Sequence, residues 1–442
     1  MPRKLAQQIL EKIEREDAYS HIALDAAMSR SDLDARDRGL ATEIVYGTLT
    51  WQRAIDSILD EHVRRDLDSL DVPVLVALRA AVYQMVFLDR IPAHAAVDEA
   101  VEIVKGGPSR AAAGLVNAVL RSLVRADDPK WWRDADREKK PVRYLGERYS
   151  LPNWIANRLV QYHGVDRAEE MCEAFNRRPP LYLRATGDED PGDLPDGVTS
   201  VEGVPGALRA DSLGDAVRDG LEEGRWVVQD LGSQLVTLYT GPGRGDAVLD
   251  ACAGLGGKTL HLARLVGDAG RVVAVDPVAS KIELLTEGAE RLGLAERIEA
   301  HVARLQDYAR DADERFDVVL VDAPCSGLGV LRRHPETRWR RREADIPKLV
   351  ALQRELIDAA AELVRPGGAL AYSVCTFTTE EGPRQVDNFL DRHDNWRLAD
   401  PPEESRGVEW KTYVDETGRL ALNPLEHDSD AFFAAVLQEV KE

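Results

Sequence analysis

Hydrophobic residues recur at helical spacing through the first 126 residues of the chain. Leu5, Ile9 and Ile13 lie four positions apart, and the same period returns in later stretches such as 75–85. Apolar side chains three and four residues apart share one face of a helix. No alternating, strand-like pattern competes with this period. Residues 1–126 are therefore predicted to form an all-α bundle of five to seven helices.

The pattern changes in the second half, where short apolar runs alternate with amphipathic stretches. Strands are expected at 247–250, 271–276, 298–302, 316–321 and 369–373. Strands that alternate with helices are typical of a parallel, doubly wound sheet. The sequence thus predicts a multidomain protein in which a Rossmann-like α/β domain, 236–442, follows the bundle. Residues 127–235 are predicted to be a connector and a small α/β subdomain.

A glycine-rich turn follows the first of these strands. A phosphate-binding P-loop would need glycine at the position of Cys252, and a dinucleotide fingerprint would need Gly or Ala at Thr259, so neither pattern fits. The turn can still bring backbone close to a nucleoside, and Asp276 ends the next strand, where an acid can accept ribose hydroxyls. Glycine-rich turns also occur in α/β domains without a ligand, so the turn alone leaves both interpretations open.

Two other strand ends carry cysteines. Cys325 follows strand 316–321 in an Asp-Ala-Pro-Cys turn that begins at Asp322, and Cys375 follows strand 369–373. A lone cysteine after a strand is more often packing than nucleophile. Two cysteines on one sheet, one of them beside an aspartate, favour covalent catalysis. The cysteines show no spacing typical of a metal site, and no metal is expected.

The net charge of −21 over 442 residues argues against a generally basic nucleic-acid-binding surface. Contacts with RNA would then come from local patches, because phosphate neutralisation drives affinity. One candidate is the basic connector, in which Lys130 and Arg133 flank Trp131 and Trp132; the other is the arginine-rich stretch 332–348. The alternative for both is a solvated charge run.

Specific segments carry a family resemblance. TEIVYGTLTWQRAID, RAAVYQMVFLDRIPAHAAVDEAVEIVK and AAAGLVNAVLRSLVR resemble the NusB-like RNA-binding domain at the front of certain ribosomal RNA methyltransferases. DACAGLGGKT, VDAPCSGLGVLRRHPETRW and RPGGALAYSVCTF resemble motifs of S-adenosylmethionine-dependent RNA cytosine-C5 methyltransferases. The likeness covers nearly the whole chain and is greatest to bacterial 16S ribosomal RNA enzymes of the RsmB type.

This resemblance implies methylation of carbon 5 of a cytidine in 16S ribosomal RNA, naked or partly assembled, through a covalent cysteine–C6 adduct. By the family pattern the nucleophile is Cys375, Cys325 is associated with product release, and Asp322 binds the cytosine edge. DNA cytosine methyltransferases use the Pro-Cys cysteine instead, so spacing alone does not rank Cys325 and Cys375. The target base is expected to be unpaired or flipped out.

The resemblance also implies where S-adenosylmethionine binds. The expected contacts are Cys252, Ala253, Gly254, Leu255, Gly256, Gly257, Lys258, Asp276, Arg304 and Asp322. The chain departs from the family at Gly254-Leu255, usually Ala-Pro, and at Arg304, usually an acid, for which Asp307 is an alternative. Val374 and Gly382 also differ from the usual residues at those positions.

Two rival functions remain: the same reaction on transfer RNA, and a non-catalytic RNA-binding factor with a decayed methyltransferase fold. Retention of Asp322, Cys325 and Cys375 together argues against decay. The N-terminus lacks an apolar signal region, and no run approaches 18 apolar residues. A monomeric, cytoplasmic protein without a membrane partner is expected.

Overall fold

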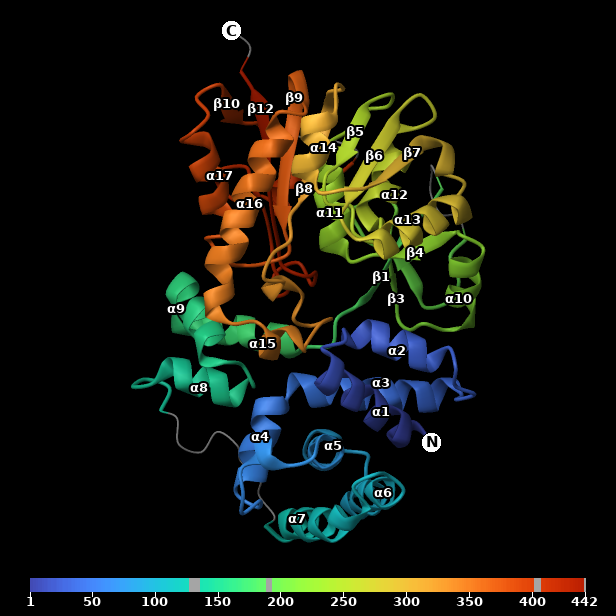
Figure 1. Ribbon diagram of the computed structural model, residues 1–442, viewed down its shortest axis with the longest axis vertical. Coiled ribbons are helices and arrows are strands. Elements are labelled where there is room, and N and C mark those ends of the chain that lie inside the picture. The colour runs from blue at the N-terminus through green and yellow to red at the C-terminus, as the bar shows by residue number, and fades with distance from the viewer. Residues whose placement is uncertain (127–135, 188–192, 401–406, 441–442) are drawn as a thin grey trace. The chain divides into compact units, whose positions relative to one another are not determined.

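The computed structural model describes residues 1–126, 136–187, 193–400 and 407–440, which fall into two compact units (Figure 1). Unit 1 comprises Met1–Arg177 and Leu331–Arg340, and unit 2 comprises Arg178–Val330 and Arg341–Glu442. The cations and tryptophans predicted to bind RNA at 130–133 lie outside the described residues. Within the described part of the chain, no helix is long and apolar enough to cross a membrane.

Residues 1–126 form seven α-helices, which confirms the predicted all-α bundle. They are α1 (Pro2–Glu16), α2 (Ser20–Met28), α3 (Ala35–Thr50), α4 (Gln52–Asp60), α5 (Val72–Phe87), α6 (Ala93–Lys105) and α7 (Ala113–Ala126). Helices α8 (Pro141–Arg148) and α9 (Asn153–Asn176) also belong to unit 1.

Helix α5 is the centre of the bundle. It is buried without interruption from Pro73 to Gln84, as expected for a helix that is apolar on all sides. Its one buried cation, Arg79, makes a two-pronged ion pair with Asp56 of α4, at 2.7 and 2.9 Å. The charge inside the core is therefore matched by a carboxylate, as burial of a guanidinium requires.

Segment 331–340, which includes the short helix α15 (Thr337–Arg340), packs inside unit 1. Arg338 is fully buried and donates to the carbonyls of Thr50 and Ser150 and to Asn176 Oδ1, at 3.2, 3.3 and 2.9 Å. Arg340 likewise donates to the main-chain carbonyls of Ile13 in α1 and of Asp17 and Ala18 in the loop that follows α1. The prediction of an RNA-contacting patch over 332–348 is thus wrong for Arg338, because a buried guanidinium cannot reach phosphates.

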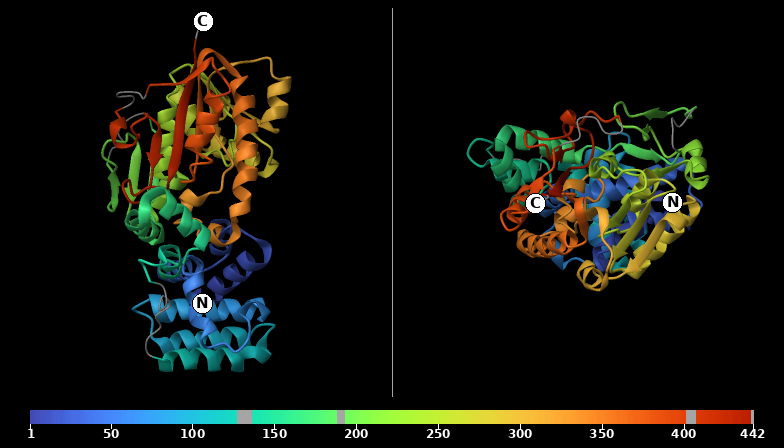
Figure 2. Two further views of the ribbon diagram at one scale, coloured as in Figure 1. Left: turned by 90° about the vertical axis from the view of Figure 1, so that its left-hand side faces the viewer. Right: turned by 90° about the horizontal axis from the view of Figure 1, so that it is seen from above.

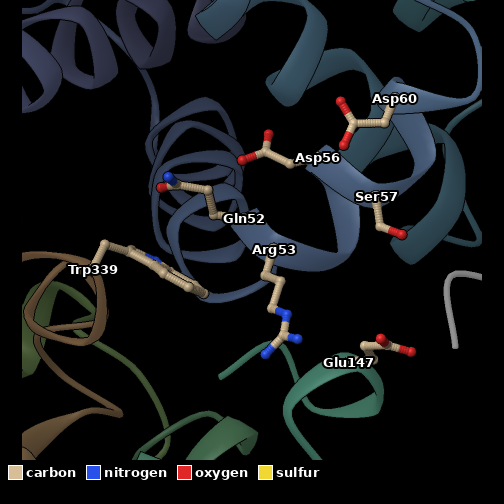
Figure 3. Close-up of a pocket in the computed structure, with 7 residues that line it drawn as sticks. All are labelled: Gln52, Arg53, Asp56, Ser57, Asp60, Glu147 and Trp339. Atoms are coloured by element: carbon tan, nitrogen blue, oxygen red, sulfur yellow. The ribbon is translucent and has the colours of Figure 1, made fainter. Parts of the chain in front are cut away.

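Trp339 of the same segment borders a polar hollow of about 380 Å³ (Figure 3). Its indole N–H donates to the carbonyl of Leu49 at 2.6 Å. The rest of the wall comes from α4 and α8, through Gln52, Arg53, Asp56, Ser57, Asp60 and Glu147. The segment therefore contributes both a buried anchor and part of the surface of unit 1.

Unit 2 begins with a small antiparallel sheet in the order β2-β3-β1-β4. Its elements are β1 (Leu181–Ala185), β2 (Val198–Ser200), β3 (Ala207–Ala210), β4 (Trp226–Val228) and helix α10 (Asp215–Glu222). Leu183 and Ala185 on one face of β1 pack with Trp226, whereas Tyr182 on the other face joins the core of the main sheet. Successive side chains of a strand point to opposite faces of the sheet, so neighbouring residues of β1 join different cores.

The main sheet has eight strands, ordered β10-β12-β9-β8-β5-β6-β7 with β11 paired to β12. Their bounds are β5 (Ala247–Asp250), β6 (Arg271–Asp276), β7 (Ile298–Val302), β8 (Phe316–Asp322), β9 (Val364–Val374), β10 (Trp396–Leu398), β11 (Leu420–Leu422) and β12 (Phe432–Glu439). Strands β5 to β9 are mutually parallel, and β10 to β12 join antiparallel. The predicted doubly wound fold is confirmed.

Helices cover both faces of this sheet. One core forms under α11 (Leu231–Thr240), α12 (Gly257–Val266) and α13 (Ala279–Arg291), and the other under α14 (Leu305–Asp311), α16 (Ile346–Ala361) and α17 (Pro383–Leu390). In Figure 2, left, the orange helix α16 lies on one side of the red strand β12 and the green small sheet on the other. The carboxyl ends of the parallel strands therefore meet at one edge, where ligands of such folds bind.

Replacing Gly47 in α3 by Ala should destabilise unit 1. The added methyl carbon would lie 1.8 Å from Cζ of Tyr83, a buried ring of α5, so the two helices would have to separate. We expect a loss on the order of 1–3 kcal/mol, as for other overpacked cores, measured as a lower melting temperature by circular dichroism.

The matched control is Gly39→Ala in the same helix, where the added carbon would meet nothing within 4 Å. That variant should gain up to about 1 kcal/mol, because alanine is the better helix former. Equal shifts of the melting temperature in both variants would show that close packing at Gly47 is unimportant.

Candidate active site

The structure brings together the three residues that the sequence predicted to be catalytic. Asp322 ends β8 and is paired in register with Ser373 of the neighbouring strand β9. The loops that follow these strands carry Cys325 and Cys375, whose sulfurs lie 3.2 Å apart. Both cysteines are only partly buried, so neither is sealed in packing.

The two sulfurs share a hydrogen bond. The hydrogen bond with Cys375, together with burial, holds the pKa of Cys325 well above its usual range. Cys325 therefore stays a thiol. In the hydrogen bond between the two cysteines, either sulfur can be the donor.

Asp322 is held by two donors, one on each oxygen. Lys258 Nζ donates to Oδ2 at 2.6 Å and Ser373 Oγ donates to Oδ1 at 2.7 Å. Burial lowers the pKa of Lys258, but the nearby Asp322 carboxylate outweighs that effect and the net pKa is raised. The ammonium of Lys258, predicted to lie with the methyl donor, is therefore paired with Asp322. Its nitrogen also lies 5.2 Å from the centre of the Phe432 ring.

The glycine-rich turn is fixed by the acid that ends β6. Asp276 accepts from the backbone N–H of Gly254 at 3.0 Å and from that of Val278 at 2.9 Å. Gly256 adopts φ of 87°, and a Cβ there would lie 2.6 Å from Leu285 Cγ, so only glycine fits. A Cβ at Gly254 or at Gly257 would instead meet nothing within 4 Å.

Open space beside this turn suits a nucleoside. Leu255 after β5, Val278 after β6 and Val302 at the end of β7 are large apolar side chains that remain exposed, at 54, 42 and 55%. Exposed apolar side chains at the ends of three adjacent strands give a surface on which a flat base can pack. Arg304 and Asp307, the two candidates for the adenine contact, follow directly at the start of α14.

Cys252, the cysteine of the glycine-rich turn, has a structural role. Burial raises the pKa of the Cys252 thiol, which therefore stays protonated and packs with the core under α16. Beside it, burial raises the pKa of Asp250 to about 6, and the Thr259 hydroxyl donates to it at 2.7 Å. The fourth cysteine, Cys172, is buried in unit 1.

Sequence reasoning missed the residue that joins the two cysteine loops, Glu381. Its carboxylate is completely buried and accepts from the backbone N–H and the hydroxyl of Ser326, at 2.8 and 2.6 Å. It also accepts from Thr378 Oγ1 at 2.7 Å and from Gln353 Nε2 at 3.1 Å. Ser326 follows Cys325 and Thr378 lies in the loop of Cys375, so one carboxylate fixes both loops. The pair Glu380-Glu381 is visible in the sequence, but the sequence does not show which of the two side chains is buried.

Two further contacts tighten the same loops. Gly329 donates to the carbonyl of Cys375 at 3.0 Å, and a Cβ at Gly329 would lie 2.0 Å from the carbonyl oxygen of Ala431. Arg341 donates to the carbonyls of Ser326 and Cys325 at 2.9 and 3.3 Å. Arg341, predicted to contact RNA, thus braces the Pro-Cys loop from within unit 2.

Comparison with known proteins identifies the family of the chain. Residues 237–438 match the family model described as 16S rRNA methyltransferase RsmB/F, and residues 1–125 match the NusB family. A probable ribosomal RNA small subunit methyltransferase B from Synechocystis is 34% identical, covering 99% of each chain. Its namesake from Bacillus subtilis is 33% identical, covering 99% of this chain and 98% of its own.

A solved structure extends the likeness to the whole fold. The crystal structure of PH0851 covers 99% of each chain with a TM-score of 0.83 and 26% sequence identity. The resemblance inferred from the motifs is thereby confirmed along the chain. On these matches, the chain belongs to the RsmB/F family of 16S ribosomal RNA methyltransferases and has a NusB-family domain at its front.

Proposed function

We propose that this enzyme methylates carbon 5 of a cytidine in 16S ribosomal RNA through a covalent adduct between Cys375 and carbon 6. The observation that carries the proposal is the pair of sulfurs 3.2 Å apart beside Asp322, at the carboxyl edge of the sheet. The names of the Synechocystis and Bacillus relatives support ribosomal RNA as the substrate.

Cys375 acts as the nucleophile. Carbon 5 of cytosine is a poor nucleophile until a thiolate adds to carbon 6 and gives the ring enamine character. Cys375 lies where it can add, and the raised pKa of Cys325 keeps a protonated partner beside it. After methylation, loss of the carbon-5 proton restores the double bond and expels the Cys375 thiolate. Cys325, 3.2 Å away, is assigned to this release step.

Asp322 binds the edge of the cytosine. Lys258 and Ser373 each occupy one lone pair of the carboxylate, which leaves the remaining lone pairs for the base. A carboxylate at this position stabilises the protonated ring nitrogen as charge develops there. Lys258 positions Asp322 through the hydrogen bond to its Oδ2.

The methyl donor is assigned to the turn 252–258 and to Asp276. S-adenosylmethionine supplies the methyl group as an electrophile attached to a sulfonium. The open backbone at Gly254 and Gly257, and the exposed side chains of Leu255 and Val302, suit its nucleoside. Arg304 or Asp307 is assigned the adenine contact.

The substrate and its surroundings complete the proposal. The target cytidine is unpaired or flipped out, because carbon 6 must be approached from the ring face. The helical domain, residues 1–126, is assigned to RNA binding on the strength of its NusB-family match. We assign the enzyme to the cytoplasm as a monomer that acts on naked or partly assembled small-subunit RNA.

Substituting the two cysteines separately should block two different steps of the reaction. Cys375→Ala should abolish transfer of radioactive methyl to unmodified small-subunit RNA, because no sulfur then adds to carbon 6. Cys325→Ala should instead accumulate a protein–RNA adduct that survives denaturing electrophoresis, because release fails. An adduct formed by Cys375→Ala and not by Cys325→Ala would reverse the two roles. Faster methylation of bulk transfer RNA than of small-subunit RNA would contradict the assignment of 16S ribosomal RNA as the substrate.

Glu381→Gln should slow the reaction without removing either cysteine. The glutamine side chain would place N–H donors where the carboxylate accepts four hydrogen bonds, so the two cysteine loops would lose their positions relative to each other. We expect kcat to fall on the order of 10²-fold, the cost of misplacing reacting groups by about 1 Å, with KM for RNA little changed. Glu380→Gln is the control, because it makes the same change at the neighbouring position, where Glu380 accepts from Thr379 at 3.3 Å. Equal losses in both variants would mean that Glu381 does not position the cysteines.

A further inference from the structure

The two sulfurs of the active site are close enough to react with each other. Cys325 Sγ and Cys375 Sγ lie 3.2 Å apart, and both residues are partly exposed, so a small oxidant can reach them. The sulfurs of a disulfide lie about 2.05 Å apart, so bond formation requires a movement of about 1 Å. Loops of folded proteins move by such amounts in ordinary thermal motion. The pair can therefore form a disulfide without rearrangement of the sheet.

Contacts next to each cysteine hold the two loops together. Ser326 and Thr376 directly follow Cys325 and Cys375, and their hydroxyl groups share a hydrogen bond at 2.8 Å. The buried carboxylate of Glu381 accepts from the hydroxyl of Ser326 at 2.6 Å. Two reacting groups that are held side by side have a high effective concentration. The fold therefore favours a bond between these two sulfurs over a bond from either one to another molecule.

The remaining cysteines lie in different surroundings. Cys172 is buried in unit 1, and burial raises the pKa of its thiol to about 12. Cys252 packs with the core under α16, and burial raises the pKa of its thiol also. Oxidants react with thiolates rather than thiols, so both side chains are protected. Of the four cysteines, all within the described residues, Cys325 and Cys375 are the two whose sulfurs contact each other.

We propose that Cys325 and Cys375 form a reversible disulfide when the enzyme meets a peroxide, and that this bond switches methyl transfer off. This regulation rests on the proposed function, in which Cys375 is the nucleophile. The ionised sulfur attacks an oxygen of the peroxide and releases hydroxide, which leaves a sulfenic acid. The second sulfur attacks the first and displaces its hydroxyl group as water. Two thiols and one hydrogen peroxide thus give one disulfide and two waters, with two electrons passing from sulfur to oxygen.

The disulfide also protects the nucleophile from permanent loss. A sulfenic acid that meets no thiol is oxidised further to a sulfinic acid, which thiols do not reduce. Cys325, 3.2 Å from Cys375, supplies the thiol that prevents this second oxidation. A dithiol then restores the enzyme by exchange, because it takes over the disulfide and returns both cysteines to thiols. Cys325 therefore acts in the resting enzyme as well as in product release.

The test counts thiols in the full chain without RNA. The parent protein is treated with hydrogen peroxide, unfolded, alkylated and analysed by mass spectrometry. Reduced protein should take four alkyl groups, one on each cysteine of the chain. Oxidised protein should take two, and its proteolytic digest should contain a peptide with Cys325 joined to a peptide with Cys375. Dithiothreitol should restore all four sites. Peroxide-treated protein without this joined pair of peptides would overturn the proposal.

Two variants give the matched comparison. In Cys325→Ser, peroxide should convert Cys375 to a sulfinic acid that dithiothreitol does not reverse, because the neighbouring thiol is absent. Cys172→Ala is the control and should form the disulfide as the parent does, because Cys172 is buried in unit 1. Equal conversion of Cys375 to sulfinic acid in the parent and in Cys325→Ser would overturn the protective role. If Cys325→Ser fails to fold, the peptide map of the parent decides.

Activity separates this inference from the proposed function. Methyl transfer by the oxidised parent should fall by about tenfold or more and return with dithiothreitol, since the nucleophile is no longer free. Full activity of protein with the mapped disulfide would overturn the switch and also contradict Cys375 as the nucleophile. Failure to form the disulfide, in protein that loses methyl transfer on Cys375→Ala, would overturn the switch and leave the proposed function intact.

Discussion

The buried carboxylate of Glu381 is the interaction on which the site depends most. Two loops from different strands must present sulfurs within 3.2 Å of each other, and neither loop is part of the sheet ladder. Glu381 accepts hydrogen bonds from both loops, through Ser326 and Thr378, and a further one from Gln353 of α16. A charge buried this deeply is tolerable because four donors surround it. Removing any one donor would leave part of that charge unpaired.

The sheet supplies the remaining precision. Parallel pairing sets Asp322 opposite Ser373, so the carboxylate and the hydroxyl that supports it are in register before any loop is considered. The turn after β5 then directs α12 so that Lys258 reaches the same carboxylate. Gly256 permits this path, because a larger residue would strike Leu285 and adopt a strained backbone. The glycine-rich turn and Asp322 are consequently joined through Lys258.

The arginines of this acidic chain fall into distinct environments. Arg79 and Arg338 are buried in unit 1 and are bound by a carboxylate or by carbonyl groups. Arg341 in unit 2 braces the loop of Cys325. Arg184 in unit 2 is equally buried and donates to Gln229 at 2.6 Å; it and Arg338 each keep at least one buried N–H without an acceptor among the described residues. Burial alone therefore does not show what an arginine is bound to; the acceptors around it do.

The sequence by itself determined the helical bundle, the strands of the doubly wound sheet, the glycine-rich turn and the identity of the two cysteines. These features depend on local periodicity and on residues at strand ends, which neighbouring positions reveal. Tertiary structure alone decided that Arg338 is an internal anchor, that Lys258 pairs with Asp322, and that Glu381 joins two loops. Each of these contacts joins residues that are far apart in the sequence. The separation is 162 positions for Arg338–Asn176, 64 for Lys258–Asp322 and 55 for Glu381–Ser326. Whether a charged side chain is exposed or buried depends on such distant partners, and a linear pattern does not contain them.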